Sequence, residues 1–256
     1  MNNFIKVGVA GALALGYVSA HAGAVIPSSS NTGDVFLFAD VIQGGSVTAA
    51  FAADTTVKVD NVTGGTAFGT LYATDGNLST LLSDAQASGA SLQWAVVGGG
   101  GHSDGSLSFV STVNNLSTLQ NRNGVNEGNW LTHFINTATL VNTNTGTNPS
   151  VLATSAGGAA NWDPTTLLSN ASNWYLNGPT NAITGLGSAT LYGVTSPASN
   201  STNPVTITNL GTVTLSAGGL SLSAPSAVPL PAAVWLLGSG ILGLVGIGRR
   251  KSSAAA

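Results

Sequence analysis

Two apolar segments without a charged side chain, one near each end of the chain, confine the folded part of this protein to the residues between them. Residues 7–18 contain about 12 apolar or small residues in a row, and residues 232–248 contain about 17. A helix needs roughly 17–25 such residues to cross a hydrocarbon core about 30 Å thick. We therefore predict one transmembrane helix, at residues 232–248, and a folded body at residues 23–223.

The first segment belongs to residues 1–22, which have the three parts of a secretory signal peptide. Lys6 supplies a positive start, residues 7–18 supply an apolar core, and Ala20 and Ala22 are the small residues of a cleavage site. The alternative is an uncleaved N-terminal anchor, which the short apolar run disfavours. The pattern predicts export through the Sec translocon, removal of the peptide by signal peptidase, and a body outside the cytoplasm.

The second segment is the middle of three consecutive parts. Pro229 and Pro231 disfavour helix in the residues before them, so Val228–Pro231 is predicted to be extended. Residues 224–227 are a Ser/Ala/Pro linker before it. After the apolar segment come three cations, which the positive-inside rule keeps on the cytoplasmic side as stop-transfer residues ahead of a tail at 252–256. They are Arg249, Arg250 and Lys251.

Together these parts, residues 228–251, resemble the PEP-CTERM sorting signal of exosortase substrates. Leu230 stands where the namesake motif has Glu, so the form Val228-Pro229-Leu230-Pro231 resembles a variant of that family. The resemblance covers about a tenth of the chain and does not extend to the body. The matching features are Pro229-Leu230-Pro231, Ala232-Ala233, Trp235-Leu236, Gly238-Ser239-Gly240, Leu242-Gly243-Leu244 and Arg249-Arg250-Lys251.

The resemblance implies that a membrane-embedded exosortase cuts near the Pro-x-Pro element and releases or transfers the protein. The chain would lie transiently in the inner membrane of a Gram-negative bacterium, then at the cell surface or in the extracellular matrix with exopolysaccharide as a further partner. In this interpretation the chain is a substrate and a structural protein, without catalytic residues of its own. The alternative for the C-terminal segment is a permanent single-span anchor.

Composition favours a folded, β-rich body. Hydrophobic residues make up 43% of the chain and charged residues 6%, whereas disordered chains are usually poor in apolar residues and rich in charge. All nine acidic residues lie in the body, where the basic residues are Lys58 and Arg122. No basic patch for nucleic acid follows from this distribution. The absence of cysteine excludes disulfides and thiolate catalysis.

Hydrophobic periodicity predicts a mainly β (α+β) fold, with an antiparallel sheet or sandwich and two or three short helices. The clearest signal is a hairpin at Gly211–Ser223, with Gly218-Gly219 as its turn. The four glycines Gly98–Gly101 are expected to form a loop. Further strands are predicted at Val35–Ala39, Ser46–Ala52, Thr55–Val62 and Ser91–Val97.

Helical spacing of apolar residues predicts a helix within Asp75–Ala90, with Asp75 or Asn77 as its N-cap. A second helix is expected at Asn129–Val141, and a short third one at Pro164–Asn170.

Candidate catalytic groups in the body are sparse. His102, Ser103 and Asp104 are adjacent, but neighbouring residues on one loop rarely converge as a triad requires, so a polar loop is the favoured interpretation. A secreted hydrolase remains as an alternative, and it requires His102 or His133 within hydrogen-bond reach of an acid. No His or carboxylate series has the spacing of a metal site, so neither a metal nor a cofactor is predicted. Glu127 and Asp163 are possible glycosidase carboxylates without a spacing that supports them.

The tryptophans suggest a second alternative, a carbohydrate-binding module of the cell surface. Trp162 and Trp174 have polar neighbours and are the candidates for glycan contact. Trp94 and Trp130 lie on apolar faces and are expected in the core.

Overall fold

The computed structural model of the chain describes residues 28, 31–44, 46–87, 90–113, 116, 123, 131, 134, 150–153, 183–198 and 201–225. Packing divides the chain into two compact units, Met1–Ala224 and Pro225–Ala256. The elements of the first unit are, in order, β1 (Thr32–Gln43), β2 (Ser46–Lys58), α1 (Val59–Thr63), β3 (Gly69–Ala73), α2 (Gly76–Ala87), β4 (Ser91–Gly101), β5 (Leu107–Thr112), β6 (Ser150–Ala153), β7 (Ile183–Thr184), β8 (Gly187–Ser196), β9 (Thr206–Ser216) and β10 (Gly219–Ser223).

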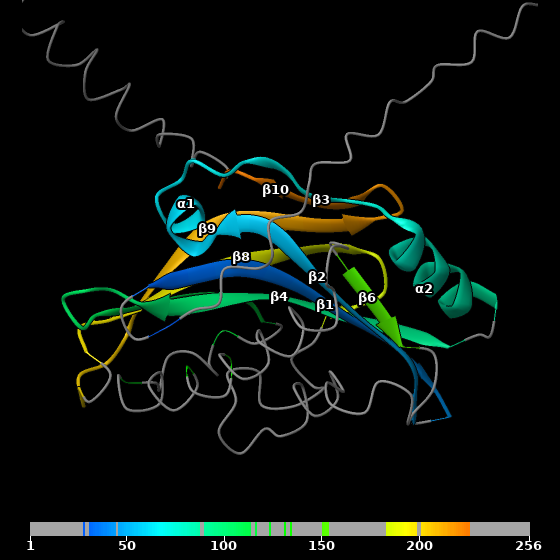
Figure 1. Cartoon of the computed structure of the whole chain (residues 1–256), viewed down its shortest axis with the longest axis horizontal. Helices are drawn as coiled ribbons and strands as arrows, with labels where there is room; N and C mark the ends of the chain where they lie inside the picture. Colours follow the sequence, from blue (N-terminus) through cyan, green and yellow to red (C-terminus); the bar gives the residue numbers. More distant parts are fainter. Residues whose placement is uncertain are drawn as a thin grey trace, which may run out of the picture. The chain divides into compact units, whose positions relative to one another are not determined.

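The described strands form one antiparallel sheet that curves into a half-barrel (Figure 1). Its order is β3-β10-β9-β8-β5-β4-β1-β2-β6, and β7 pairs with β4 beside this path. Phe51 of β2 and Tyr72 of β3 come from near opposite ends of that order, yet their ring centroids lie 6.2 Å apart. The face that carries both rings is therefore the inner face of the half-barrel. The predicted mainly β, antiparallel fold is confirmed, whereas the predicted transmembrane helix lies outside the described residues.

Each face of the sheet carries its own hydrophobic core. In β1, Phe36 and Phe38 point to the outer face, where Phe134 packs edge-on against Phe36 with centroids 5.8 Å apart. Leu37 and Val41 point to the inner face. Burial on both faces explains why the middle of β1 reads as a nearly continuous apolar run.

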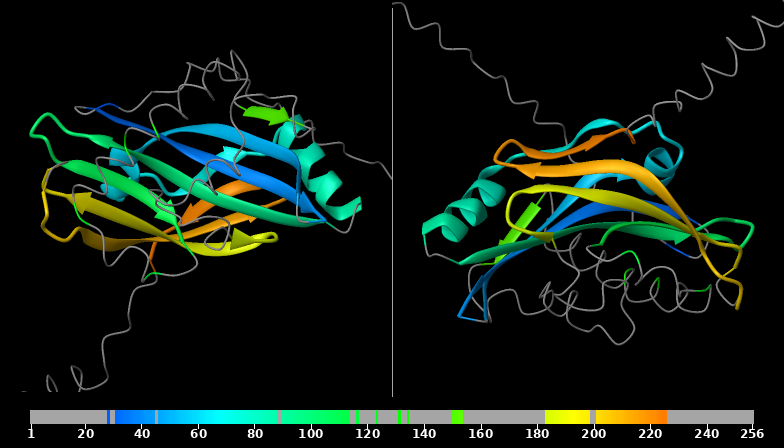
Figure 2. Two further views of the ribbon diagram at one scale, coloured as in Figure 1. Left: turned by 90° about the horizontal axis from the view of Figure 1, so that it is seen from below. Right: turned by 180° about the vertical axis from the view of Figure 1, so that it is seen from behind.

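The two helices close the inner face near opposite ends of the strands (Figures 1 and 2). Val59 and Val62 of α1, three residues apart, are buried there, and so are Leu78, Leu81 and Leu82 of α2. Helix α2 begins where predicted, because Asp75 Oδ1 accepts the backbone N–H of Leu78 at 2.8 Å as an N-cap. The expected helix at Pro164–Asn170 lies outside the described residues.

The expected helix at Asn129–Val141 lies outside the described residues except at two positions. Leu131 and Phe134 are helical and buried against the outer face.

The prediction of a strand at Thr55–Val62 was wrong in its second half. Strand β2 continues to Lys58, and the chain then turns into α1. The alternation of Val57 and Val59 fits a strand, but the spacing of Val59 and Val62 fits one face of a helix equally well. In the structure both Val59 and Val62 are buried in the inner core as part of α1. Ahead of the helix, Thr56 adopts φ 58°, a strained value for a β-branched residue, and its N–H donates to Asp54 Oδ1 at 2.8 Å.

The prediction of a loop at Gly98–Gly101 was also wrong. These glycines form the second half of β4, buried and paired with both β1 and β5. A Cβ on Gly98 would lie 2.8 Å from a methyl carbon of Val59. Because glycine has no side chain, α1 can pack closely against β4 at this position. A Cβ on Gly100 would lie 2.7 Å from the Cα of Thr32. The glycines therefore permit close approach within a strand.

The C-terminal hairpin formed as predicted, with a turn one residue earlier than expected. Ser216 pairs with Gly219, so Ala217 and Gly218 are the two turn residues. Gly219 is the first residue of β10 and has φ 113°. A Cβ on Gly219 would overlap the carbonyl oxygen of Tyr72 in β3, which is why glycine stands at this position.

Candidate functional site

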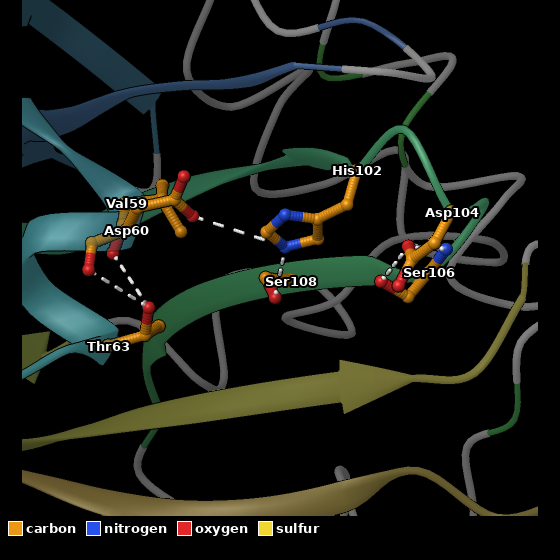
Figure 3. A network of polar contacts seen from close by, with 7 residues as sticks. All are labelled: Val59, Asp60, Thr63, His102, Asp104, Ser106 and Ser108. Carbon is orange, nitrogen blue, oxygen red and sulfur yellow. Dashed lines mark hydrogen bonds and ion pairs between the residues drawn. The ribbon is translucent and has the colours of Figure 1, made fainter.

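The β4–β5 hairpin and α1 bring three polar side chains together at one end of the sheet (Figure 3). His102 follows β4 directly, and its backbone N–H donates to the carbonyl of Ser106 across the hairpin loop. Ser108 lies in β5 opposite Gly100 and is 7% exposed. Asp60 lies in the first turn of α1, where a carboxylate is favourable.

The imidazole of His102 contacts both other side chains through the same nitrogen. His102 Nε2 lies 2.8 Å from Ser108 Oγ and 4.0 Å from Asp60 Oδ1. In an acid–histidine–serine triad, the carboxylate orients one ring nitrogen while the other receives the serine proton. Here both contacts converge on Nε2. The Asp60 distance exceeds a hydrogen bond, and that carboxylate is half exposed. The network therefore joins the hairpin to α1 and lacks the geometry of a proton relay.

The neighbouring Asp104 belongs to a separate set of contacts. Its Oδ1 accepts the hydroxyl of Ser106 at 2.6 Å and the backbone N–H of Ser106 at 2.9 Å. The Ser106 hydroxyl is the main cause that holds the pKa of the Asp104 carboxyl below its usual value, followed by the backbone bond. The His102 and Asp104 side chains thus hydrogen-bond to different residues, Ser108 and Ser106, and residues 102–106 form the polar loop that the sequence predicted.

A second polar cluster ties β6 to the start of α2. Asp75 caps the helix through Oδ1 and accepts the Ser150 hydroxyl through Oδ2. Asn77 Nδ2 donates to the Ser150 hydroxyl at 2.9 Å and to its carbonyl at 3.2 Å. Burial raises the pKa of the nearby Tyr72 hydroxyl far above its usual range, and the Asp75 carboxylate acts in the same direction. Both Asp75 carboxylate oxygens accept hydrogen bonds, one from α2 and one from β6, so the cluster holds the edge strand β6 against the start of α2.

Sequence reasoning missed the partners in both clusters. Asp60 was assigned to a strand, and Ser150 lies 75 residues from Asp75 with no local pattern to single it out. Trp94 is fully buried as expected, and its Nε1 donates to the carbonyl of Gly185 at 2.8 Å. The remaining candidate residues lie outside the described residues: Ala20, Ala22, Glu127, Trp130, His133, Trp162, Asp163, Trp174, Val228, Pro229, Leu230, Pro231, Arg249, Arg250 and Lys251.

Within the described ranges, no three His, Asp or Glu side chains gather as a possible metal site. In the same residues, no helix has the length and hydrophobicity needed to cross a membrane.

No family model, no curated protein and no solved structure matches the chain.

We expect the His102–Ser108 contact to contribute modestly to stability. Replacing His102 with alanine should lower the free energy of unfolding by about 1 kcal/mol, because the Ser108 hydroxyl loses its partner. A double-mutant cycle with Ser108→Ala should return most of that value as coupling. Asp60→Asn is the matched control and should change stability by less than about 0.5 kcal/mol, since a half-exposed ion pair contributes little. Denaturant unfolding measures wild type and the four variants, and purely additive effects in the cycle would contradict the contact.

Proposed function

We propose that this chain is an exported protein of the cell surface or extracellular matrix whose C-terminal segment is a sorting signal processed by an exosortase. The observation that carries the proposal is the order of three parts: Val228–Pro231, the uncharged residues 232–248, and the three cations that follow. That order resembles the PEP-CTERM signal, and a simple membrane anchor does not require the proline element.

For the body, we propose a structural role in the matrix, with exopolysaccharide as a partner. The apolar side chains of its strands and helices pack into two hydrophobic cores, and its polar clusters hydrogen-bond one element of the fold to another. Both features are typical of a structural role. The hydrolase alternative gains no support from His102, because its serine and acid contacts share one nitrogen. The carbohydrate-binding alternative depends on Trp162 and Trp174, and a glycan array with the purified protein tests it.

Intact-mass measurement of the protein from cells with and without the exosortase tests the sorting proposal. We expect the mature protein from cells with the enzyme to lack residues 1–22 and the three terminal cations. Without the enzyme, the C-terminal segment should remain. Replacing both Pro229 and Pro231 with alanine should also preserve that segment, because the strip would no longer be held extended. A mature protein that keeps Arg249, Arg250 and Lys251 at wild-type abundance in cells with the enzyme would refute the proposal.

A further inference from the structure

The last strand among the described residues is an interior strand of the sheet, and of the residues that follow it the structure describes Ala224 and Pro225. Strand β10 pairs with β9 on one edge and with β3 on the other. Leu220 and Leu222 are each 1% exposed and lie in the inner core. A strand held at both edges and anchored by two buried side chains can be withdrawn only by opening the sheet.

This pairing extends to Ser223 and stops there. Ser223 lies opposite Thr212 in β9. A Cβ on Gly211 would overlap the carbonyl oxygen of Ser223, which shows how closely the end of β10 packs on its neighbour. Ala224 and Pro225 are exposed and belong to no strand. Ala224 is thus the first residue after β10 whose backbone lies outside the sheet.

Resting on the proposed processing of the C-terminal segment, we infer that the folded body sets the upstream limit of that processing: the cut falls after Ser223, while β10 remains paired. Processing breaks one peptide C–N bond, transfers the acyl carbon to water or to an acceptor amine, and leaves a proton on the departing nitrogen. An enzyme must bind the chain around that bond in an extended form with accessible backbone groups. Residues 219–223 do not offer such a segment, because their backbone is engaged in the sheet.

The linker of residues 224–227 provides a matched pair of variants. Deleting these four residues joins the paired end of β10 directly to Val228, and we expect the processed fraction in cells to fall by about tenfold or more. Inserting Gly-Ser-Gly-Ser after Ala224 should leave the processed fraction unchanged. Tryptophan fluorescence, to which the buried Trp94 contributes, reports whether each variant is folded. Processing of the deletion variant at the wild-type level, or a wild-type mature end before Ala224, would overturn the inference.

A second measurement does not depend on the exosortase. A broad-specificity protease added to the purified full-length protein should cut after Ser223 before it cuts within residues 206–223. Gly211→Ala should raise the rate of cuts within 206–223 by about tenfold, because the methyl group displaces the end of β10. Gly218→Ala is the control, since a Cβ there lies no closer than 3.6 Å to its nearest neighbour, the Ser216 hydroxyl. Wild-type cuts within 219–223 as fast as cuts after Ala224 would overturn the inference.

The two measurements separate the two proposals. An unprocessed C-terminus in cells, with the expected protease pattern, refutes the proposed function and supports the boundary at Ser223. A processed protein whose end lies before Ala224 supports the sorting proposal and refutes the boundary.

Discussion

Replacing Gly100 with alanine should lower the free energy of unfolding by about 3 kcal/mol, the range expected when a well-packed core is overfilled. The new Cβ would lie 2.7 Å from the Cα of Thr32 and would overlap the carbonyl oxygen of Asn31. Both obstacles are backbone atoms of the neighbouring segment, which cannot rotate away as a side chain does. Relief would require β1 and β4 to separate at this end, where Thr32 and Gly100 are paired.

Urea unfolding of the purified protein, followed by tryptophan fluorescence, to which the buried Trp94 contributes, measures this effect. Gly76→Ala is the control, because a Cβ at this first residue of α2 has no atom within 4 Å. That variant should be neutral or more stable by up to about 1 kcal/mol, since alanine favours the helix. If Gly100→Ala loses less than about 1 kcal/mol, the close pairing of β1 with the glycine half of β4 is wrong.

The second large effect concerns a carboxyl group buried in β2. Asp54 is 1% exposed, and burial raises its pKa to about 7; the nearby Asp34 carboxylate also raises it, and the N–H of Thr56 opposes the shift. Because the pKa in the folded state exceeds that of the unfolded chain, the folded state holds the proton more tightly. This contribution to stability is fully present below about pH 4 and is lost as the pH rises through about 7.

We therefore expect the free energy of unfolding to fall by a few kcal/mol between pH 4 and pH 8. Asp54→Asn should flatten this slope and make the protein more stable than wild type at pH 8, since the amide oxygen still accepts the Thr56 N–H without a charge. Asp104→Asn should leave the slope unchanged, because the lowered pKa of Asp104 puts its titration below this range. Urea unfolding at several pH values gives the slope, and an equal slope in wild type and Asp54→Asn would contradict the assigned burial.

Sequence reasoning predicted the C-terminal hairpin and α2, in which one face of the element is buried and the other is more exposed. In β9 and β10 the apolar residues are buried: Val213, Leu215, Leu220 and Leu222. The Ser and Thr residues between them are more exposed, and Gly219 is buried against the backbone of β3. Alternation is therefore visible in the sequence. The same holds for α2, whose buried leucines follow helical spacing and whose cap is Asp75.

Sequence reasoning failed where the structure of a residue depends on contacts with residues far away in the sequence. A run of glycines normally marks a loop, and nothing adjacent to Gly98–Gly101 indicates that β1 and α1 pack against it. The candidate site shows the same limit. His102 was recognised as a polar group, but its partners Ser108 and Asp60 come from a different strand and from a helix that the sequence did not predict.

The sequence by itself determined the broad organisation: a β-rich body between two apolar segments, and a C-terminal order of proline strip, apolar segment and cations. Such features are local, because hydrophobic period, proline geometry and runs of charge act over neighbouring residues. The tertiary structure alone decided that the glycine run is a buried strand, that α1 replaces the end of a strand, and that β10 is locked between β9 and β3. These outcomes depend on which segments, distant in the sequence, can pack closely against each other. The free energy of such packing depends on both segments together, so neither segment alone reveals it.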